Sequence, residues 1–230
     1  MNDDAQKPTE ASLVTARLRE DILSGTVPPG SKIKLVPLAK RYQVSRGPLR
    51  EAASRLASEG LVHIEDQRGF RAAPVSLQDL RDVTHTRQRV ELLALRDAIQ
   101  HGDLEWEGRV MASCHILERV TDHNGDPDAL AAFAEQHRAF HEVLVEACPS
   151  QYLLRFRERL YTLTERYRNL AANLYASGTR ERNIAEEHQA IAEAAVSRDA
   201  DLASSLLADH LGTTADVLIE AYPDLFGDDA

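Results

Sequence analysis

Apolar residues recur at helical spacing in the first part of the chain. Val14, Leu18 and Ile22 are four residues apart, so they share one face of an amphipathic helix. Further along, Ser45 is a favourable N-cap residue for a helix that begins at Arg46. The pattern predicts three helices here, over residues 11–24, 36–42 and 46–59.

Two short runs of strand-forming residues follow the third helix. Leu61–Ile64 and Phe70–Ala73 flank a polar turn that contains Gly69, a residue that adopts positive φ without strain. These runs predict a β-hairpin. Three helices with a tight link between the second and third, followed by a hairpin, are typical of a winged helix-turn-helix. We expect this fold over residues 11–75, after a disordered tail formed by residues 1–10.

From residue 76 onwards the pattern is helical throughout, with breaks at glycine, proline and Asn-Gly positions. The predicted helices cover residues 77–100, 103–122, 127–147, 151–176, 180–197 and 200–221. Because the links between them are short, the helices predict an antiparallel bundle over residues 76–222, with its own core and space for a ligand between helices. Residues 223–230 are expected to form a second tail. The fold class is therefore mainly α.

The composition agrees with this fold class. Aromatic residues make up only 5% of the chain, and 11 glycines and 9 prolines are few for 230 residues, which disfavours a β-sandwich or barrel. No run reaches the roughly 18 apolar residues of a membrane span, and the N-terminus is acidic, unlike a signal peptide. We therefore expect a cytoplasmic protein with no membrane partner. Cys114 and Cys148 lack paired spacing, so neither a disulfide framework nor a cysteine zinc site is expected.

The charge is distributed unevenly between the two parts of the chain. The net charge of -10 would argue against a nucleic-acid partner if it were spread evenly. Residues 1–75, however, contain 12 Lys and Arg against 9 Asp and Glu, whereas residues 76–230 contain 15 against 28. The first part is therefore net positive, at +3, and its charge suits contacts with phosphate groups.

Arginine side chains occupy one face of the third predicted helix. Leu49 and Leu56 lie on its apolar face, and Arg46, Gly47 and Arg50 lie on the opposite face near its N-terminal end. There, arginine can bind guanine O6 and N7, and glycine lets the backbone approach the duplex. Further candidates for DNA contacts, to phosphates or by the hairpin tip to the minor groove, are Lys34, Lys40, Arg41, Ser45, Arg68 and Gly69. The alternative is an ordinary solvated face.

Four histidines lie on predicted helices of the second part. His137 and His141 share one helix face with Phe133, and His188 and His210 each lie mid-helix beside small or apolar residues. Four imidazoles from three helices can converge on one ion, and nitrogen ligands suit zinc, nickel or copper rather than magnesium or calcium. The alternative is four unrelated histidines whose nitrogens bond to water or to the backbone.

Several segments of the first part resemble the N-terminal signature of GntR-type bacterial transcription regulators, over about 65 residues. The segments are Leu23–Gly25, Pro29–Ser31, Val44–Ala52, Glu59–Val62 and Arg68–Phe70. Leu35 and Pro37 stand where that family often has acidic residues. The resemblance implies a regulator whose winged helix binds double-stranded DNA.

Residues 76–222 resemble the helical FCD-type effector domain of the FadR branch of this family. Many members place Asp-x-x-x-His on one helix and single histidines on two later helices. The resemblance puts His141, His188 and His210 at the three histidine positions, and His137 where the aspartate usually is. It implies a bound divalent transition metal, zinc or nickel, although the change from aspartate to histidine removes a negative charge and leaves the identity of the metal open.

Arg87 and Glu91 match an Arg-x-x-x-Glu pair of the same family, in which the arginine is associated with binding an effector carboxylate. The resemblance implies that Arg87 binds a small carboxylate effector, together with an open position on the metal. The alternative for Arg87 is a surface ion pair with Glu91.

The leading interpretation is a DNA-binding transcriptional regulator, most simply a repressor, that binds an inverted-repeat operator as a homodimer and senses a small organic acid. One alternative is a helical metalloenzyme, but Arg138 and Phe140 stand where zincins need a catalytic glutamate. Another is a module whose winged helix binds protein. The sequence names neither the operator nor the effector.

Overall fold

The computed structural model describes residues 9–66, 68–121, 126–175, 182–221 and 226. The chain divides into two compact units, residues 1–76 and 77–230, and each is described by itself. Most of the two predicted tails, residues 1–10 and 223–230, lies outside the described residues. None of the helices in the described ranges combines the length and the apolar character that are needed to cross a membrane.

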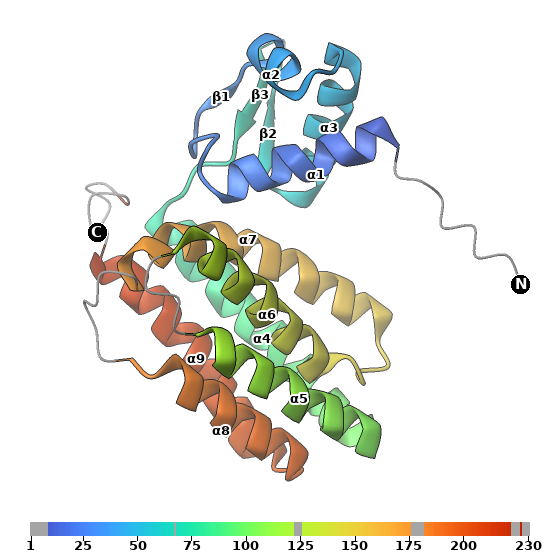
Figure 1. Ribbon diagram of the computed structural model, residues 1–230, viewed down its shortest axis with the longest axis vertical. Coiled ribbons are helices and arrows are strands. Elements are labelled where there is room, and N and C mark those ends of the chain that lie inside the picture. Colours follow the sequence, from blue (N-terminus) through green and yellow to red (C-terminus); the bar gives the residue numbers. More distant parts are fainter. Residues whose placement is uncertain (1–8, 67, 122–125, 176–181, 222–225, 227–230) are drawn as a thin grey trace, which may run out of the picture. The chain divides into compact units, whose positions relative to one another are not determined.

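The first unit contains the three helices that the sequence predicts, with ends that differ by at most one residue (Figure 1). They are α1 (Glu10–Leu23), α2 (Leu35–Tyr42) and α3 (Arg46–Glu59). Helix α1 starts after Thr9, whose side chain accepts a hydrogen bond from the Ser12 backbone amide. Leu18, Leu49 and Leu56 are completely buried where α1 packs against α3. One face of α3 therefore belongs to the core.

The wing of the first unit is a small antiparallel sheet with the strand order β1-β3-β2. Its strands are β1 (Lys32–Ile33), β2 (Val62–Glu65) and β3 (Gly69–Ala72). The predicted hairpin is confirmed, with Ile64 opposite Phe70 and a φ of 97° at Gly69. Strand β1 was not predicted, because two residues are too few to show the alternation of a strand. It forms only because it pairs with β3, which is distant in sequence.

The second unit is all-helical within the described residues, as predicted. Its helices are α4 (Leu77–His101), α5 (Leu104–Val120), α6 (Pro127–Val145), α7 (Gln151–Tyr175), α8 (Ile184–Val196) and α9 (Ala200–Ala221). Helix α8 begins after Asn183, whose side chain accepts a hydrogen bond from the Glu186 amide. The sequence predicted a start at residue 180, which lies outside the described residues.

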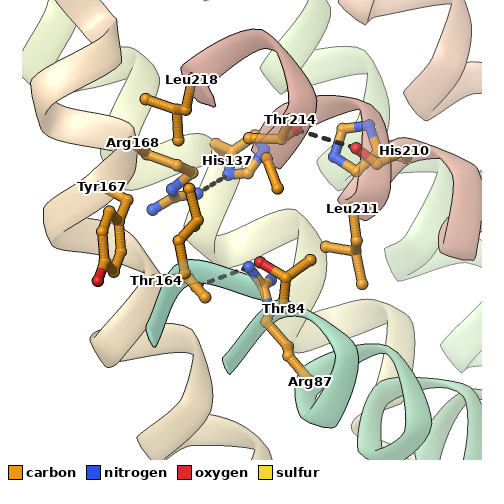
Figure 2. A pocket seen from close by; sticks show the side chains of 12 residues that line it. Thr84, Arg87, His137, Thr164, Tyr167, Arg168, His210, Leu211, Thr214 and Leu218 are labelled. Atoms are coloured by element: carbon orange, nitrogen blue, oxygen red, sulfur yellow. Dashed lines mark hydrogen bonds between the residues drawn. The ribbon is translucent and has the colours of Figure 1, made fainter. Parts of the chain in front are cut away.

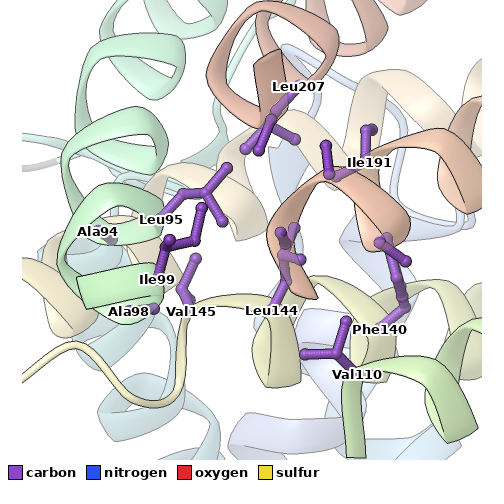
Figure 3. Packing of buried hydrophobic residues seen from close by; sticks show 14 of the residues in the cluster. Ala94, Leu95, Ala98, Ile99, Val110, Phe140, Leu144, Val145, Ile191 and Leu207 are labelled. Carbon is purple, nitrogen blue, oxygen red and sulfur yellow. The ribbon is translucent and has the colours of Figure 1, made fainter. Parts of the chain in front are cut away.

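A continuous apolar core joins five of these helices, α4, α5, α6, α8 and α9 (Figure 3). Leu95, Phe140, Ile191 and Leu207 are at its centre and are fully buried. The ring of Phe140 lies edge-on to that of His188, with 5.1 Å between centroids. The apolar core therefore borders directly on the histidines of α6 and α8 and excludes water from that side.

Candidate nucleic-acid interface and metal centre

The residues predicted to read DNA bases lie on the outer face of α3. Arg46 and Arg50 are exposed and one turn apart, whereas Leu49 and Ala53 are completely buried on the inner face. The guanidinium carbon of Arg50 lies 6.0 Å from the centroid of the Phe70 ring in β3, so the start of α3 is close to the wing. Neither arginine is buried in the core of the unit, and both are accessible to a partner.

The other residues predicted to contact DNA are exposed as well: Lys34, Lys40, Arg41, Ser45, Arg68 and Gly69. Arg41 donates a hydrogen bond from Nη2 to Asp21 at 3.0 Å, yet 48% of its side chain stays exposed. Ser45 occupies the N-cap position of α3, but its side chain makes no capping hydrogen bond. Lys34, Lys40, Arg41 and Ser45 precede α3 along the chain, and Arg68 and Gly69 lie at the turn of the wing. Phosphate contacts beside a reading helix need such positions.

Gly47 lies in the first turn of α3, where neither the space around it nor the backbone conformation requires a glycine. A Cβ atom built on it would come no closer than 3.8 Å to any other atom, the Ser45 Oγ, which is ordinary van der Waals contact. Its φ is not positive, so an alanine would fit the backbone. Glycine is unfavourable in a helix, by up to about 1 kcal/mol relative to alanine. An external partner that approaches the backbone would account for the glycine.

The structure brings the four histidines predicted as ligands together. His137 and His141 come from α6, His188 from α8 and His210 from α9, and each is at most 6% exposed. One ligand nitrogen from each residue lies within 4.8 Å of the others. Four buried imidazoles this close form a candidate site for one metal ion.

Two of these histidines leave buried polar atoms without partners. Both ring nitrogens of His141 and of His188 lack a hydrogen bond within the described part of the chain. A buried polar group without a partner costs about 1–3 kcal/mol. A metal ion would satisfy one nitrogen of each ring, and a donor set of neutral imidazoles is of the kind that zinc and nickel prefer. The residues present therefore fit a divalent transition metal.

Burial lowers the pKa of all four imidazoles below the ordinary value for histidine. At His137 the positive charge of Arg168 lowers the pKa further. At His210 a hydrogen bond to Glu187 opposes the effect of burial on the pKa. The four rings are therefore neutral at pH 7, which is the form that coordinates metals.

Glu187 fixes the tautomer of His210. Its Oε2 lies 2.8 Å from His210 Nδ1 and 2.6 Å from Arg182 Nη2. Partial burial raises the pKa of Glu187, but the hydrogen bonds from Arg182 and His210 outweigh it and lower the pKa to about 2. Because an ionised carboxylate only accepts hydrogen bonds, neutral His210 carries its proton on Nδ1 and keeps the Nε2 lone pair for a metal.

Arg168 fixes the opposite tautomer at His137. Its Nη1 lies 2.6 Å from His137 Nδ1 and also donates a hydrogen bond to the Tyr161 hydroxyl at 2.9 Å. Because a guanidinium only donates hydrogen bonds, Nδ1 must be the acceptor, and neutral His137 carries its proton on Nε2. Arg168 was not singled out by the sequence analysis. The signal for it is the spacing of Tyr161, Thr164 and Arg168 at i, i+3 and i+7, which places them on one face of α7.

Arg87, predicted to bind an effector carboxylate, is buried rather than at the surface. Its Nε donates to Glu91 at 3.1 Å and its Nη1 to Thr164 Oγ1 at 2.9 Å. The ion pair with Glu91 therefore forms, but only 4% of the Arg87 side chain is exposed, so the pair is buried and not at the surface. Glu91 also accepts a hydrogen bond from Arg157 at 3.0 Å, and Arg87 Nη2 has no partner within the described residues. One carboxylate is therefore shared by two buried guanidinium groups.

A pocket joins the arginines to the histidines (Figure 2). Its polar lining includes Arg87, Arg168, His137 and His210, and leucines such as Leu211 and Leu218 cover another side. A few polar groups set among apolar walls are typical of a site for a small molecule.

Comparison with known protein families identifies both units. Residues 10–71 match the gntR family of bacterial regulatory proteins. Residues 82–213 match the FCD domain, which is more than half of the chain.

Relatives of similar length match most of the chain. The HTH-type transcriptional regulator BphR of Paraburkholderia xenovorans is 41% identical, over 88% of this chain and 82% of its own length. The HTH-type transcriptional repressor GlaR of Escherichia coli is 35% identical, over 89% of this chain and 93% of its own. Among solved structures, E. coli McbR/YncC has the same fold, with a TM-score of 0.77 at 19% identity, over 93% of this chain and 99% of that one.

Proposed function

Because the chain belongs to the gntR family of bacterial regulatory proteins and carries an FCD domain, we propose that it is a repressor that binds an inverted-repeat operator as a homodimer. That it is a DNA-binding transcriptional regulator follows from the family itself. Relatives over most of its length include the repressors GlaR and RspR of E. coli. These relatives are regulators rather than enzymes, which sets the metalloenzyme alternative aside.

The DNA-binding half of the proposal rests on the outer face of α3. Arg46 and Arg50 read base edges in the major groove, and Gly47 lets the helix approach the duplex. Lys34, Lys40, Arg41 and Ser45 bind phosphates, and Arg68 with Gly69 places the wing tip against the backbone or minor groove. The support is that all these residues are exposed, while their helical neighbours on the inner face are buried.

The sensing half of the proposal rests on the histidine cluster. His137, His141, His188 and His210 hold one divalent transition metal, zinc or nickel. When bound, the metal supplies a position that attracts an anionic oxygen. The observation that carries this assignment is the pair of buried imidazoles, His141 and His188, whose four ring nitrogens have no hydrogen-bond partner among the described residues.

The effector is a small carboxylate that enters the pocket beside these histidines. Arg87 binds it, because its Nη2 is buried without a partner within the described residues and its guanidinium lines the pocket. Glu91 and Thr164 hold the other two nitrogens of Arg87, so the guanidinium is fixed before the acid arrives. A fixed donor loses little entropy on binding.

Elemental analysis of gently purified protein, followed by calorimetry with zinc and nickel, tests the metal site. We expect about one ion per chain, or uptake of one by the stripped protein. A protein that contains no metal and binds neither ion would refute the site.

The regulatory role is tested by selecting DNA fragments from the genome with the metal-loaded protein, in the presence and absence of candidate acids. If the selected fragments bind equally well with and without every acid, the sensing half of the proposal is contradicted and the DNA-binding half is not.

A further inference from the structure

The carboxylate of Glu91 is divided between two arginines. Its Oε1 accepts a hydrogen bond from Arg87 Nε at 3.1 Å, and its Oε2 accepts one from Arg157 Nε at 3.0 Å. Both arginine side chains are 4% exposed, and that of Glu91 is 1% exposed. Each oxygen of this buried carboxylate therefore binds one guanidinium group, and it does so through Nε alone.

Two other arginine–glutamate pairs of the chain have a different geometry. Arg182 donates from Nε to Glu187 Oε1 at 2.7 Å and from Nη2 to Oε2 at 2.6 Å. Arg19 binds Glu59 through the same two nitrogens, Nε and Nη2. A guanidinium presents these two N–H groups side by side, at a spacing that matches the two oxygens of a carboxylate. An arginine that has both oxygens within reach can therefore engage Nε and Nη2 together.

Arg87 lacks the second of these two hydrogen bonds. Its Nη2 is buried without a partner within the described residues, although Glu91 already binds the adjacent Nε. The oxygen that Nη2 would need, Glu91 Oε2, is bound to Arg157 instead. Arg87 lines the pocket, whereas Arg157 and Glu91 are not among the lining residues (Figure 2). The unpaired nitrogen therefore belongs to the one arginine of the three side chains that a ligand in the pocket can contact.

We propose that Arg157 is a positioning residue, which binds Glu91 Oε2 and so keeps Arg87 Nη2 open for the carboxylate of the effector. This inference rests on the proposed function, in which Arg87 binds that carboxylate. Without Arg157, Oε2 would be a buried acceptor without a partner, which is unfavourable, and it would bind Arg87 Nη2. Arg157 therefore controls the affinity for the acid without contact with it.

A crystal structure of the Arg157→Met variant tests the geometric step without any acid. We expect Glu91 to bind Arg87 through both Nε and Nη2, as Glu187 binds Arg182. If Glu91 kept its single hydrogen bond to Arg87 Nε and left Nη2 unpaired, the proposal would be refuted. Melting curves establish that the variant folds, and Arg157→Leu replaces it if it does not.

A double-mutant cycle tests the effect on ligand binding, by calorimetry on the full-length protein in the presence of zinc. The probes are linear monocarboxylates and dicarboxylates of two to six carbons. For the acid that binds the wild type most tightly, Arg157→Met should raise Kd roughly tenfold or more, as expected for a lost hydrogen bond to a charged group. In a Glu91→Gln background the same change should raise Kd by less than about threefold, because an amide has only one acceptor oxygen for Arg87. Losses of equal size in both backgrounds would mean that Arg157 acts through its charge or through packing, and would overturn the inference.

Arg138→Met is the matched control for the loss of a positive charge. The guanidinium carbons of Arg138 and Arg157 lie 5.4 Å and 5.2 Å from the centroid of the Tyr161 ring. Arg138, however, pairs with Glu142 and not with Glu91. Its replacement should change Kd for the acid by less than about threefold, and a loss as large as that in Arg157→Met would overturn the inference. If no acid bound the wild type, the sensing half of the proposed function would fail, and the structure of Arg157→Met would still decide whether Arg157 keeps Nη2 open.

Discussion

The two units place their candidate functional residues in opposite environments. In the first unit, Arg46 and Arg50 are exposed and lie outside the apolar core. In the second unit, His141 and His188 are completely enclosed, and their nitrogens have no protein partner among the described residues. An exposed residue can be replaced with little effect on folding, whereas a buried polar group without a partner lowers stability. The DNA-binding residues and the sensing residues should therefore differ in how function and stability respond to mutation.

The largest expected effect is on the acid stability of the metal-free protein. Burial lowers the pKa of all four imidazoles, so the unfolded chain binds more protons than the folded one below about pH 6.5. The free energy of unfolding therefore has its full value above that pH. It falls as the pH drops, by up to about 1.4 kcal/mol per pH unit for each histidine. Thermal melting between pH 7.5 and 5 measures this loss. A flat melting temperature across that range would show that the rings protonate freely in the folded state.

Replacement of two metal-binding histidines should have the next largest effect on stability. His141→Ala with His188→Ala should abolish metal binding and the stabilisation that it gives, about 3–4 kcal/mol at 100 to 1,000 times Kd. Affinity of the ligand-free protein for DNA should remain nearly unchanged, because the reading residues lie in the other unit. Calorimetry and DNA-binding titrations on the same preparation separate the two effects. Loss of DNA binding in the metal-free variant would mean that the two units depend on each other.

The sequence predicted the helices of both units because their amphipathic periodicity and their caps are local signals. Helix α3 is an example, since Ser45 and Gly60 mark its ends and its burial follows the spacing of Leu49 and Leu56. Strand β1 was missed, because pairing with β3 alone defines it. A feature that depends on distant pairing leaves no periodic pattern.

The candidate metal site was only partly predictable for a similar reason. The four histidines are distinctive residues on predicted helices, and the structure brings them together. Arg168 was missed because α7 contains many arginines, and composition does not show which of them lies against His137. The burial of Arg87 was missed as well, since its pairing with Glu91 looks the same in sequence whether the pair is exposed or enclosed.

Base reading by α3 should give a smaller effect, restricted to specific DNA. Arg46→Ala and Arg50→Ala should each weaken binding to the cognate site by about 1–3 kcal/mol and change binding to random DNA little. Lys40→Ala is the comparison, because loss of a phosphate contact weakens both alike and lowers the salt dependence. Titrations on both DNAs at two salt concentrations distinguish these outcomes. Equal losses for all three variants on both DNAs would contradict the assignment of the arginines to bases.

The smallest effect is expected at Gly47, where folding and DNA binding should respond in opposite directions. Because a Cβ atom would meet nothing closer than 3.8 Å, Gly47→Ala should stabilise the first unit, by up to about 1 kcal/mol. The same methyl group should weaken DNA binding if the backbone of α3 approaches the duplex.

Gly108 provides the matched control, since it is exposed in α5 of the other unit and a Cβ atom there would have no neighbour within 4 Å. Gly108→Ala should raise stability without any change in DNA affinity. Melting curves and DNA titrations of the two variants measure both quantities. If Gly47→Ala bound DNA as tightly as the wild type, close approach of the duplex at this turn would be excluded. The glycine would then have no explanation in either the fold or the proposed function.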